Sequence, residues 1–208
     1  MKKIFLILFN YVAISSYSQQ INIDKNVSIL FPGKPNTSKE ITKKIEAQVY
    51  YLNANDSFVG VRIEGIDKPF PLLKNEADLK EFYKMFSVDF IKKCNKKGLI
   101  TKSTSFTKKG QYLVYKIEFV DEKSKIENGK GLVLFASGIT YVFIYSKVEN
   151  YSTERCKTFF SSININDNLS QIQSQLDYLS PIIKILLGIG VIVLLRLYRK
   201  RRGNQASS

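Results

Sequence analysis

The sequence contains no histidine among its 208 residues, and this absence excludes several kinds of catalytic and metal site. Histidine is the commonest general base near neutral pH, the base of Ser–His and Cys–His pairs, and a frequent zinc ligand. With only two cysteines, the chain also shows no pattern of metal ligands. We therefore expect no catalytic residue, no cofactor and no metal ion, and we predict that the protein is not an enzyme.

Acidic residues are also scarce, with 18 Asp and Glu against 32 Lys and Arg, so the formal charge is +14. Eight of these bases and none of the acids lie in residues 1–18 and 179–208. More than half of the excess positive charge therefore flanks two apolar segments. Because that charge belongs to membrane-targeting patterns, it is no evidence for a nucleic-acid partner, and we expect none.

The first apolar segment has the layout of a secretory signal peptide. Lys2 and Lys3 precede a short apolar run, and Ser16 and Ser18 supply small residues before a cleavage point that we place after residue 18. No cysteine lies near that point, which excludes a lipoprotein. The alternative of an uncleaved anchor is disfavoured because the run is too short for a bilayer core of ~30 Å.

The second apolar segment, residues 179–198, is long enough to cross a membrane and is followed by a basic tail at 199–208. The positive-inside rule assigns such a tail to the cytoplasm. We therefore predict a single-pass protein of the cytoplasmic membrane, with its N-terminal domain outside; the alternative is a very apolar core helix. The bases that determine this topology are Arg196, Arg199, Lys200, Arg201 and Arg202.

Between these segments, residues 19–165 are typical of one α+β domain. Apolar residues alternate with polar ones in several stretches, as in Leu113 to Phe119, which predicts strands. From Leu79 to Ile91 the apolar spacing changes to three or four residues, which predicts an amphipathic helix that ends before Gly98. A second, short helix is expected to begin at Ser152 or Thr153, and the polar residues 166–178 are expected to be a linker.

Several stretches of this domain resemble the PsbP-like domains, a family of exported domains named for a lumenal photosystem II subunit. They are FPGKP after the first strand, DLKEFYKMFSVDFIKK, KKGQYLVYKIEF, ITYVFIYS and ERCKTFFSSINI. The resemblance covers about residues 24–165 and implies an antiparallel sheet flanked by helices on both faces. The expected fold class is thus α+β of this PsbP-like kind, with one C-terminal transmembrane helix added. Fold analogy does not supply a function.

The two thiols, Cys94 and Cys156, both fall on apolar faces of the predicted helices. One interpretation is a pair of buried cysteines, and the other is a disulfide, which an exported domain would permit. The disulfide requires both helices on the same side of the sheet, with Cα atoms ~5.5 Å apart.

Lysines are dense around the end of the longer helix and the following strand. This cluster is either an anion-attracting face for phospholipid head groups or an acidic partner, or a solvated surface. Its members are Lys92, Lys93, Lys96, Lys97, Lys102, Lys108 and Lys109.

The sequence therefore favours a membrane-anchored, exported interaction domain that binds or stabilises an envelope or membrane partner, most simply a protein, without catalysis. Tethering raises the effective concentration toward such a partner. One alternative is an envelope hydrolase or transferase that uses carboxylates such as Glu118, Asp121 and Glu122. Another is a receptor that signals through a partner, because residues 203–208 are too few for an output domain.

Overall fold

The computed structural model describes residues 18–173, apart from residues 43, 54–55, 97 and 148–151. Within these residues the helices are α2 (Glu76–Asn95) and α3 (Thr153–Ser161). The strands are β1 (Gln19–Asn22), β2 (Val27–Phe31), β3 (Asn36–Ile41), β4 (Ile45–Asn53), β5 (Asp56–Gly65), β6 (Leu99–Lys109), β7 (Tyr112–Asp121), β8 (Glu127–Ala136), β9 (Ile139–Lys147) and β10 (Asn164–Ile165).

The strands form two antiparallel sheets. The large sheet has the order β3-β4-β5-β9-β8-β7-β6, and the small one has the order β1-β2-β10. Most neighbouring strands in the large sheet are also consecutive in the chain. The exception is the pair of β5 and β9, which joins strands that are far apart in the sequence. Side chains alternate between the two faces of each strand, so each face of the large sheet needs its own cover.

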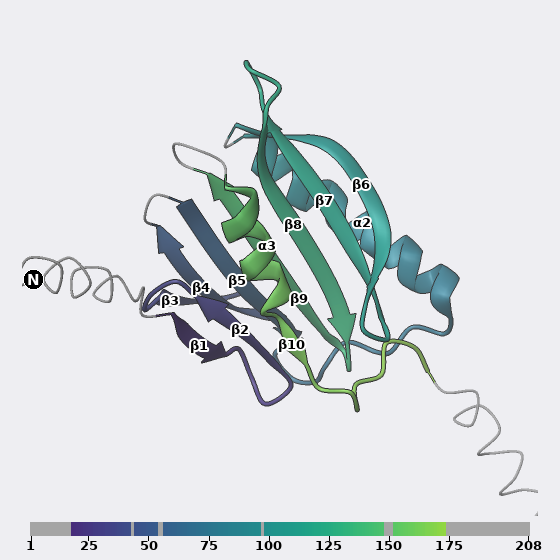
Figure 1. The fold of residues 1–208 in the computed structure, drawn as a ribbon. Coiled ribbons are helices and arrows are strands. Elements are labelled where there is room, and N and C mark those ends of the chain that lie inside the picture. Colours follow the sequence, from purple (N-terminus) through teal and green to yellow (C-terminus); the bar gives the residue numbers. More distant parts are fainter. Residues whose placement is uncertain (1–17, 43, 54–55, 97, 148–151, 174–208) are drawn as a thin grey trace, which may run out of the picture. The chain divides into compact units, whose positions relative to one another are not determined.

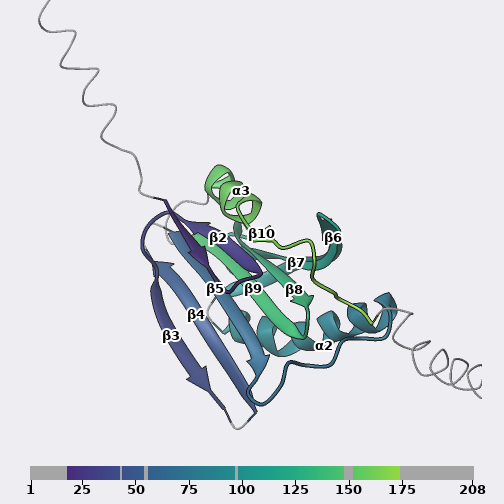
Figure 2. The ribbon, with the colours of Figure 1, turned by 90° about the horizontal axis from the view of Figure 1, so that it is seen from below.

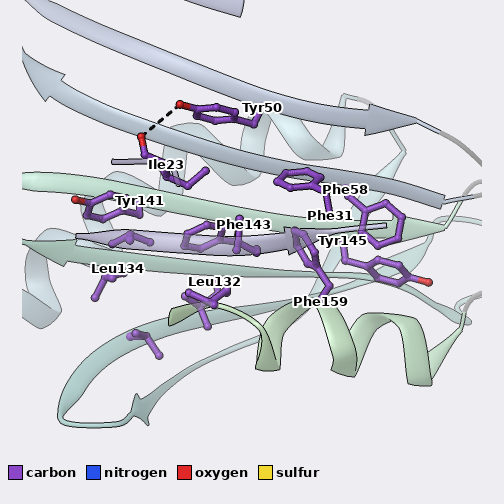
Figure 3. Packing of buried hydrophobic residues seen from close by; sticks show 14 of the residues in the cluster. Ile23, Phe31, Tyr50, Phe58, Leu132, Leu134, Tyr141, Phe143, Tyr145 and Phe159 are labelled. Carbon is purple, nitrogen blue, oxygen red and sulfur yellow. Dashed lines mark hydrogen bonds between the residues drawn. The ribbon is translucent and has the colours of Figure 1, made fainter. Parts of the chain in front are cut away.

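The two faces are covered differently. Figures 1 and 2 show α2 on one side of the large sheet, and the small sheet together with α3 on the other. On the α3 side, one cluster of buried side chains joins β2, β5, β8 and β9 to the helix, and Figure 3 shows Phe31, Phe58 and Phe159 packed within it. The ring of Phe159 makes edge contacts with Phe31 and Phe58 at centroid distances of 5.7 and 5.3 Å, which fixes α3 over the sheet.

The other cluster lies under α2 and confirms the amphipathic helix that the sequence predicts. Asn75 caps the helix by accepting a hydrogen bond from the Asp78 amide at 2.9 Å. Leu79 and Tyr83 are fully buried against β7 and β8. The helix ends at Asn95, and Gly98 takes a φ of +83°, which turns the chain into β6.

The turn between β8 and β9 requires a glycine. Ser137 and Gly138 both have positive φ, +50° and +76°. A Cβ atom on Gly138 would lie 2.3 Å from the carbonyl oxygen of Phe70, because the segment before α2 passes directly over this turn. The Phe70 amide donates a hydrogen bond to the Gly138 carbonyl at 2.9 Å, which holds that segment in place.

The first part of the predicted linker lies on the domain, and the compact unit of the chain extends to Gln171. The Ser137 amide donates to the Ser170 carbonyl at 2.7 Å, and the Leu169 amide donates to the Tyr112 hydroxyl at 3.3 Å. Gln171 reaches β7 and β8: its Nε2 donates to the carbonyls of Leu113 and Phe135 at 2.7 and 2.9 Å.

The expected fold class, one antiparallel sheet flanked by helices on both faces, is wrong. The described chain is mostly strand and contains two antiparallel sheets, and the small sheet shares one face of the large sheet with α3. The physical reason lies in β2, where Val27, Ile29 and Phe31 are buried in the core while both edges of the strand are paired by β1 and β10. Sequence patterns predicted β2, but they did not predict its two short partners.

The targeting segments fall mainly outside the described residues. These are residues 1–17 of the predicted signal peptide, the predicted span at 179–198 and the basic tail at 199–208 with its topology-determining bases. Among the residues that are described, no helix is both long and apolar enough to cross a membrane.

Candidate functional site

A pocket of about 400 Å³ opens between α3 and strands β6, β7 and β8, on the α3 side of the large sheet. This volume is in the range of small-molecule sites. We call it the lysine pocket, and its lining residues are Thr107, Lys108, Lys109, Val114, Lys116, Lys130, Gly131, Leu132, Thr153, Cys156, Lys157, Phe160 and Ser161.

The wall formed by α3 is held in place at the start of the helix. Ser152 caps it by accepting a hydrogen bond from the Arg155 amide at 3.2 Å, as the sequence suggested. The Arg155 guanidinium forms an ion pair with Asp56, whose carboxylate is buried at the start of β5, with Nε and Oδ2 3.0 Å apart. These contacts set the distance between α3 and the sheet, and therefore the width of the lysine pocket.

The bottom of the lysine pocket is apolar. Val114 of β7 and Leu132 of β8 are buried there, Cys156 lies on the helix side, and the half-buried Phe160 ring adds to the wall. The four-carbon stems of the lysines extend this apolar surface, because long basic side chains expose only their ends to water. A ligand entering here meets hydrocarbon below and ammonium groups above.

The rim is basic, and none of the described residues that line the pocket is acidic. Lys116 and Lys130 form ion pairs with carboxylates outside the lining, Glu118 at 2.7 Å and Glu127 at 2.9 Å. Lys157 is exposed and makes no ion pair with the residues that the structure describes. The rim therefore presents uncompensated positive charge to any ligand.

The ion pairs of the rim persist across physiological pH. Hydrogen bonds from Lys116 and Ser103 lower the pKa of Glu118 to about 2. Burial lowers the pKa of Lys130, but its hydrogen bond with Glu127 and the neighbouring Cys156, Glu127 and Glu118 outweigh burial and leave the pKa raised. Both groups stay charged at neutral pH.

Lys109 is the most constrained lysine of the rim. Its ammonium donates a hydrogen bond to the Phe160 carbonyl at 2.9 Å, near the end of α3, where partial negative charge favours a cation. Burial lowers the pKa of Lys109 from its usual value, and no carboxylate among the described residues is paired with it. An anion bound nearby would offset that desolvation.

The structure divides the lysine cluster of the sequence into two places. Lys109 faces the pocket, whereas Lys108 points to the α2 side of the sheet, near Glu76, and Lys92 and Lys93 lie in the last turn of α2. Sequence reasoning missed Lys116, Lys130 and Lys157, which come from β7, β8 and α3. The alternation in β7 put Lys116 on a predicted solvated face, and only the packing of α3 brings it to a pocket.

The carboxylates considered for acid–base chemistry have other contacts. Glu118 binds Lys116 and Ser103, and Asp121 accepts hydrogen bonds from the Lys123 and Ser124 amides in the turn after β7. Glu122 is exposed in that turn. None of the three lines the lysine pocket.

No disulfide joins Cys94 and Cys156. Cys94 is buried in the cluster under α2, and Cys156 is buried in the cluster under α3, so the large sheet lies between them. Two cysteines on opposite faces of a sheet cannot bring their Cα atoms within the ~7 Å that a disulfide needs. Of the two interpretations left by the sequence, the structure favours two separate buried thiols.

We expect iodoacetamide to alkylate both thiols when the purified chain is unfolded without reductant, because the structure places neither in a disulfide. Mass spectrometry should find two adducts on each chain, and few or none before unfolding, since both side chains are buried. An unmodified chain that gains two adducts only after reduction would contradict this placement of the two helices.

Comparison with protein-family models and with curated proteins found no match for this chain. The resemblance to PsbP-like domains therefore stays a prediction from the sequence.

Proposed function

We propose that this chain is a non-catalytic binding module, exported and tethered to the cytoplasmic membrane, that holds an envelope or membrane partner through an anionic group in the lysine pocket. The observation that carries the proposal is the rim of four lysines (Lys109, Lys116, Lys130 and Lys157) over an apolar floor, with no acid among the described lining residues. Like charges gathered at a pocket repel one another, and a bound anion removes that repulsion.

The tether is proposed from the sequence, in which residues 1–18 have the layout of a signal peptide and 179–198 that of a membrane span. This topology places residues 19–178 outside the cytoplasm and residues 199–208 inside. A membrane-held pocket needs only modest intrinsic affinity, because tethering raises the local concentration of partners in the same membrane. The proposal includes no cofactor and no nucleic acid.

The test is photocrosslinking in cells that produce the full chain with a photoreactive residue at Ser161, which is exposed on the pocket wall. We expect a discrete adduct in the membrane fraction. Lys109→Glu combined with Lys157→Glu should reduce its yield by about tenfold or more, because two attractive charges become repulsive and a loss of 1.4 kcal/mol in binding free energy weakens binding tenfold.

The matched control is Lys34→Glu combined with Lys123→Glu, which makes the same change in net charge at two exposed residues outside the lining. This control should leave the adduct unchanged. Equal loss in both variants would mean that overall charge matters and the pocket does not. Extraction of the protein from membranes by carbonate would separately refute the membrane tether.

A further inference from the structure

The lysine pocket has two chemically different parts, and they constrain its ligand more narrowly than charge alone does. Val114 and Leu132 lie at its bottom, while the ammonium groups of Lys109 and Lys157 lie at its rim. An inorganic anion would pair with the lysines of the rim but would leave the apolar floor in contact with water. A neutral hydrocarbon would fill the floor and leave the lysines unpaired.

The lysines of the rim differ in whether they are already paired with a carboxylate, and this difference indicates where a head group would bind. Lys116 and Lys130 already have Glu118 and Glu127 as partners. Lys109 of β6 donates to the Phe160 carbonyl, a neutral acceptor, and Lys157 lies on α3, so these two lysines belong to the two elements that border the opening. An anion between these two elements would be paired by cations from both sides.

The tail has a defined place as well. The half-buried Phe160 ring, the Leu132 side chain and the lysine stems enclose the space below the rim. Ordered side chains hold this space open, because Arg155 with Asp56, and Phe159 with Phe31, fix the helix that forms one wall. A pre-formed apolar pocket with a few convergent polar groups is the usual form of a small-molecule site.

We propose that the ligand of the lysine pocket is an amphiphilic anion, with a carboxylate or phosphate head at Lys109 and Lys157 and a short hydrocarbon tail over Val114, Leu132 and Phe160. This inference rests on the proposed binding function of the pocket and names the chemical class that it takes. The same chemistry could be supplied by the head group and first methylenes of a membrane lipid, or by a free amphiphile.

The test uses the full chain in nanodiscs of zwitterionic lipid, with empty nanodiscs subtracted, and hexyl phosphate as the probe. We expect hexyl phosphate and hexanoate to bind at least about tenfold more tightly than inorganic phosphate or hexanol. Inorganic phosphate lacks the tail and hexanol lacks the charged head, and a loss of 1.4 kcal/mol in binding free energy weakens binding tenfold. Equal binding of inorganic phosphate, equal binding of hexanol, or no binding of hexyl phosphate would each overturn the inference.

Two variants separate the pocket from adsorption elsewhere. Thr107→Trp places a large ring at an exposed lining position and should weaken hexyl phosphate binding by about tenfold or more. Thr104→Trp is the control, because Thr104 pairs with Ile117 and lies on the opposite face of β6, where the affinity should not change. The same affinity in both variants would overturn the assignment to this pocket.

The source of the anion follows from repeating the titration in nanodiscs that contain anionic lipid. Weaker binding of hexyl phosphate there would mean that lipid head groups compete for the pocket, and unchanged binding would favour a free amphiphile; both results support the shared chemistry. If hexyl phosphate does not bind while the Ser161 adduct persists and depends on Lys109 and Lys157, the ligand class is wrong and the binding module stands. If neither hexyl phosphate binding nor the Ser161 adduct is observed, both the ligand class and the binding module are wrong.

Discussion

Replacing Tyr83 with alanine is expected to lower the free energy of unfolding by about 4 kcal/mol, and replacing it with phenylalanine by about 2 kcal/mol. The Tyr83 ring is fully buried under α2, where it contacts the rings of Phe106 and Tyr115. Its hydroxyl donates to the Leu113 carbonyl at 2.8 Å and accepts from the Phe135 amide at 2.9 Å. Alanine removes both the packing and the hydrogen bonds, whereas phenylalanine removes the hydrogen bonds alone.

The Tyr83 hydroxyl is important because β7 and β8 cease to pair with each other at this point. The pairing of β7 with β8 ends at Tyr115 and Val133, so Leu113 and Phe135 have no partner across the β7–β8 edge, although each is still paired with the strand on its other side. Tyr83 and Gln171 fill the gap, and Gln171 also accepts a hydrogen bond from the Leu113 amide through Oε1 at 2.7 Å. Unpaired backbone groups in a buried gap are costly, which gives a single hydroxyl this large effect.

Equilibrium denaturation of the full chain, followed by circular dichroism, measures these differences. Gln171→Ala should lower stability by about 1–3 kcal/mol, and its effect should not add to that of Tyr83→Phe because the two side chains share backbone partners. Tyr51→Phe is the control, since the Tyr51 hydroxyl has no hydrogen bond with the described residues. Equal effects of Tyr51→Phe and Tyr83→Phe would contradict the proposed gap.

A pH titration gives a second readout for Tyr83. Burial raises the pKa of Tyr83 well above its usual value near 10. A raised pKa means that the stabilisation is complete below about pH 10, where the unfolded tyrosine is also neutral, and is lost as the pH rises toward the pKa of the folded protein. Stability should therefore fall less steeply above about pH 10 in Tyr83→Phe than in the unchanged chain.

Asp24→Ala is expected to lower the free energy of unfolding by about 3 kcal/mol. Oδ1 of Asp24 accepts hydrogen bonds from the amides of Asn26 and Val27 at 2.7 and 3.0 Å, which shapes the turn between β1 and β2. Its Oδ2 accepts from Arg62 Nε at 3.0 Å and from the Tyr141 hydroxyl at 2.7 Å, both on the large sheet. One carboxylate thus joins the small sheet to the large one.

The Asp24→Asn substitution distinguishes the contribution of the turn to stability from that of the ion pair. An asparagine keeps an acceptor for the two turn amides, but it places an amide donor against the Arg62 guanidinium, and we expect a loss of about 2 kcal/mol. Arg62 retains its bidentate contact with Glu64, which limits the damage. Asp67→Ala, at an exposed position, should change stability by less than about 0.5 kcal/mol. A change that small in Asp24→Ala would refute the role given to this carboxylate.

The sequence by itself determined the elements whose causes are local. Leu79 and Tyr83 fix the helical period of α2, Ser152 marks the start of α3, and the alternation in β7 is a property of successive residues. From the sequence alone, residues 39–52 are expected to form one extended segment, whereas the structure divides them into parts of β3 and β4. That turn was missed because it contains neither glycine nor proline, the usual signals.

Only the tertiary structure decided what depends on residues far apart in the chain. The alternation of β7 does not reveal that α3 packs beside Lys116, or that Cys94 and Cys156 lie on opposite faces of the sheet. Likewise, the polar composition of residues 166–178 indicated a linker, yet Gln171 pairs with backbone groups that β7 and β8 leave open. Spacing along the chain encodes the period of a helix or strand, whereas the sides on which elements pack follow from burying all the apolar faces together. The lysine pocket is a product of that packing, and so the sequence showed its lysines without their arrangement.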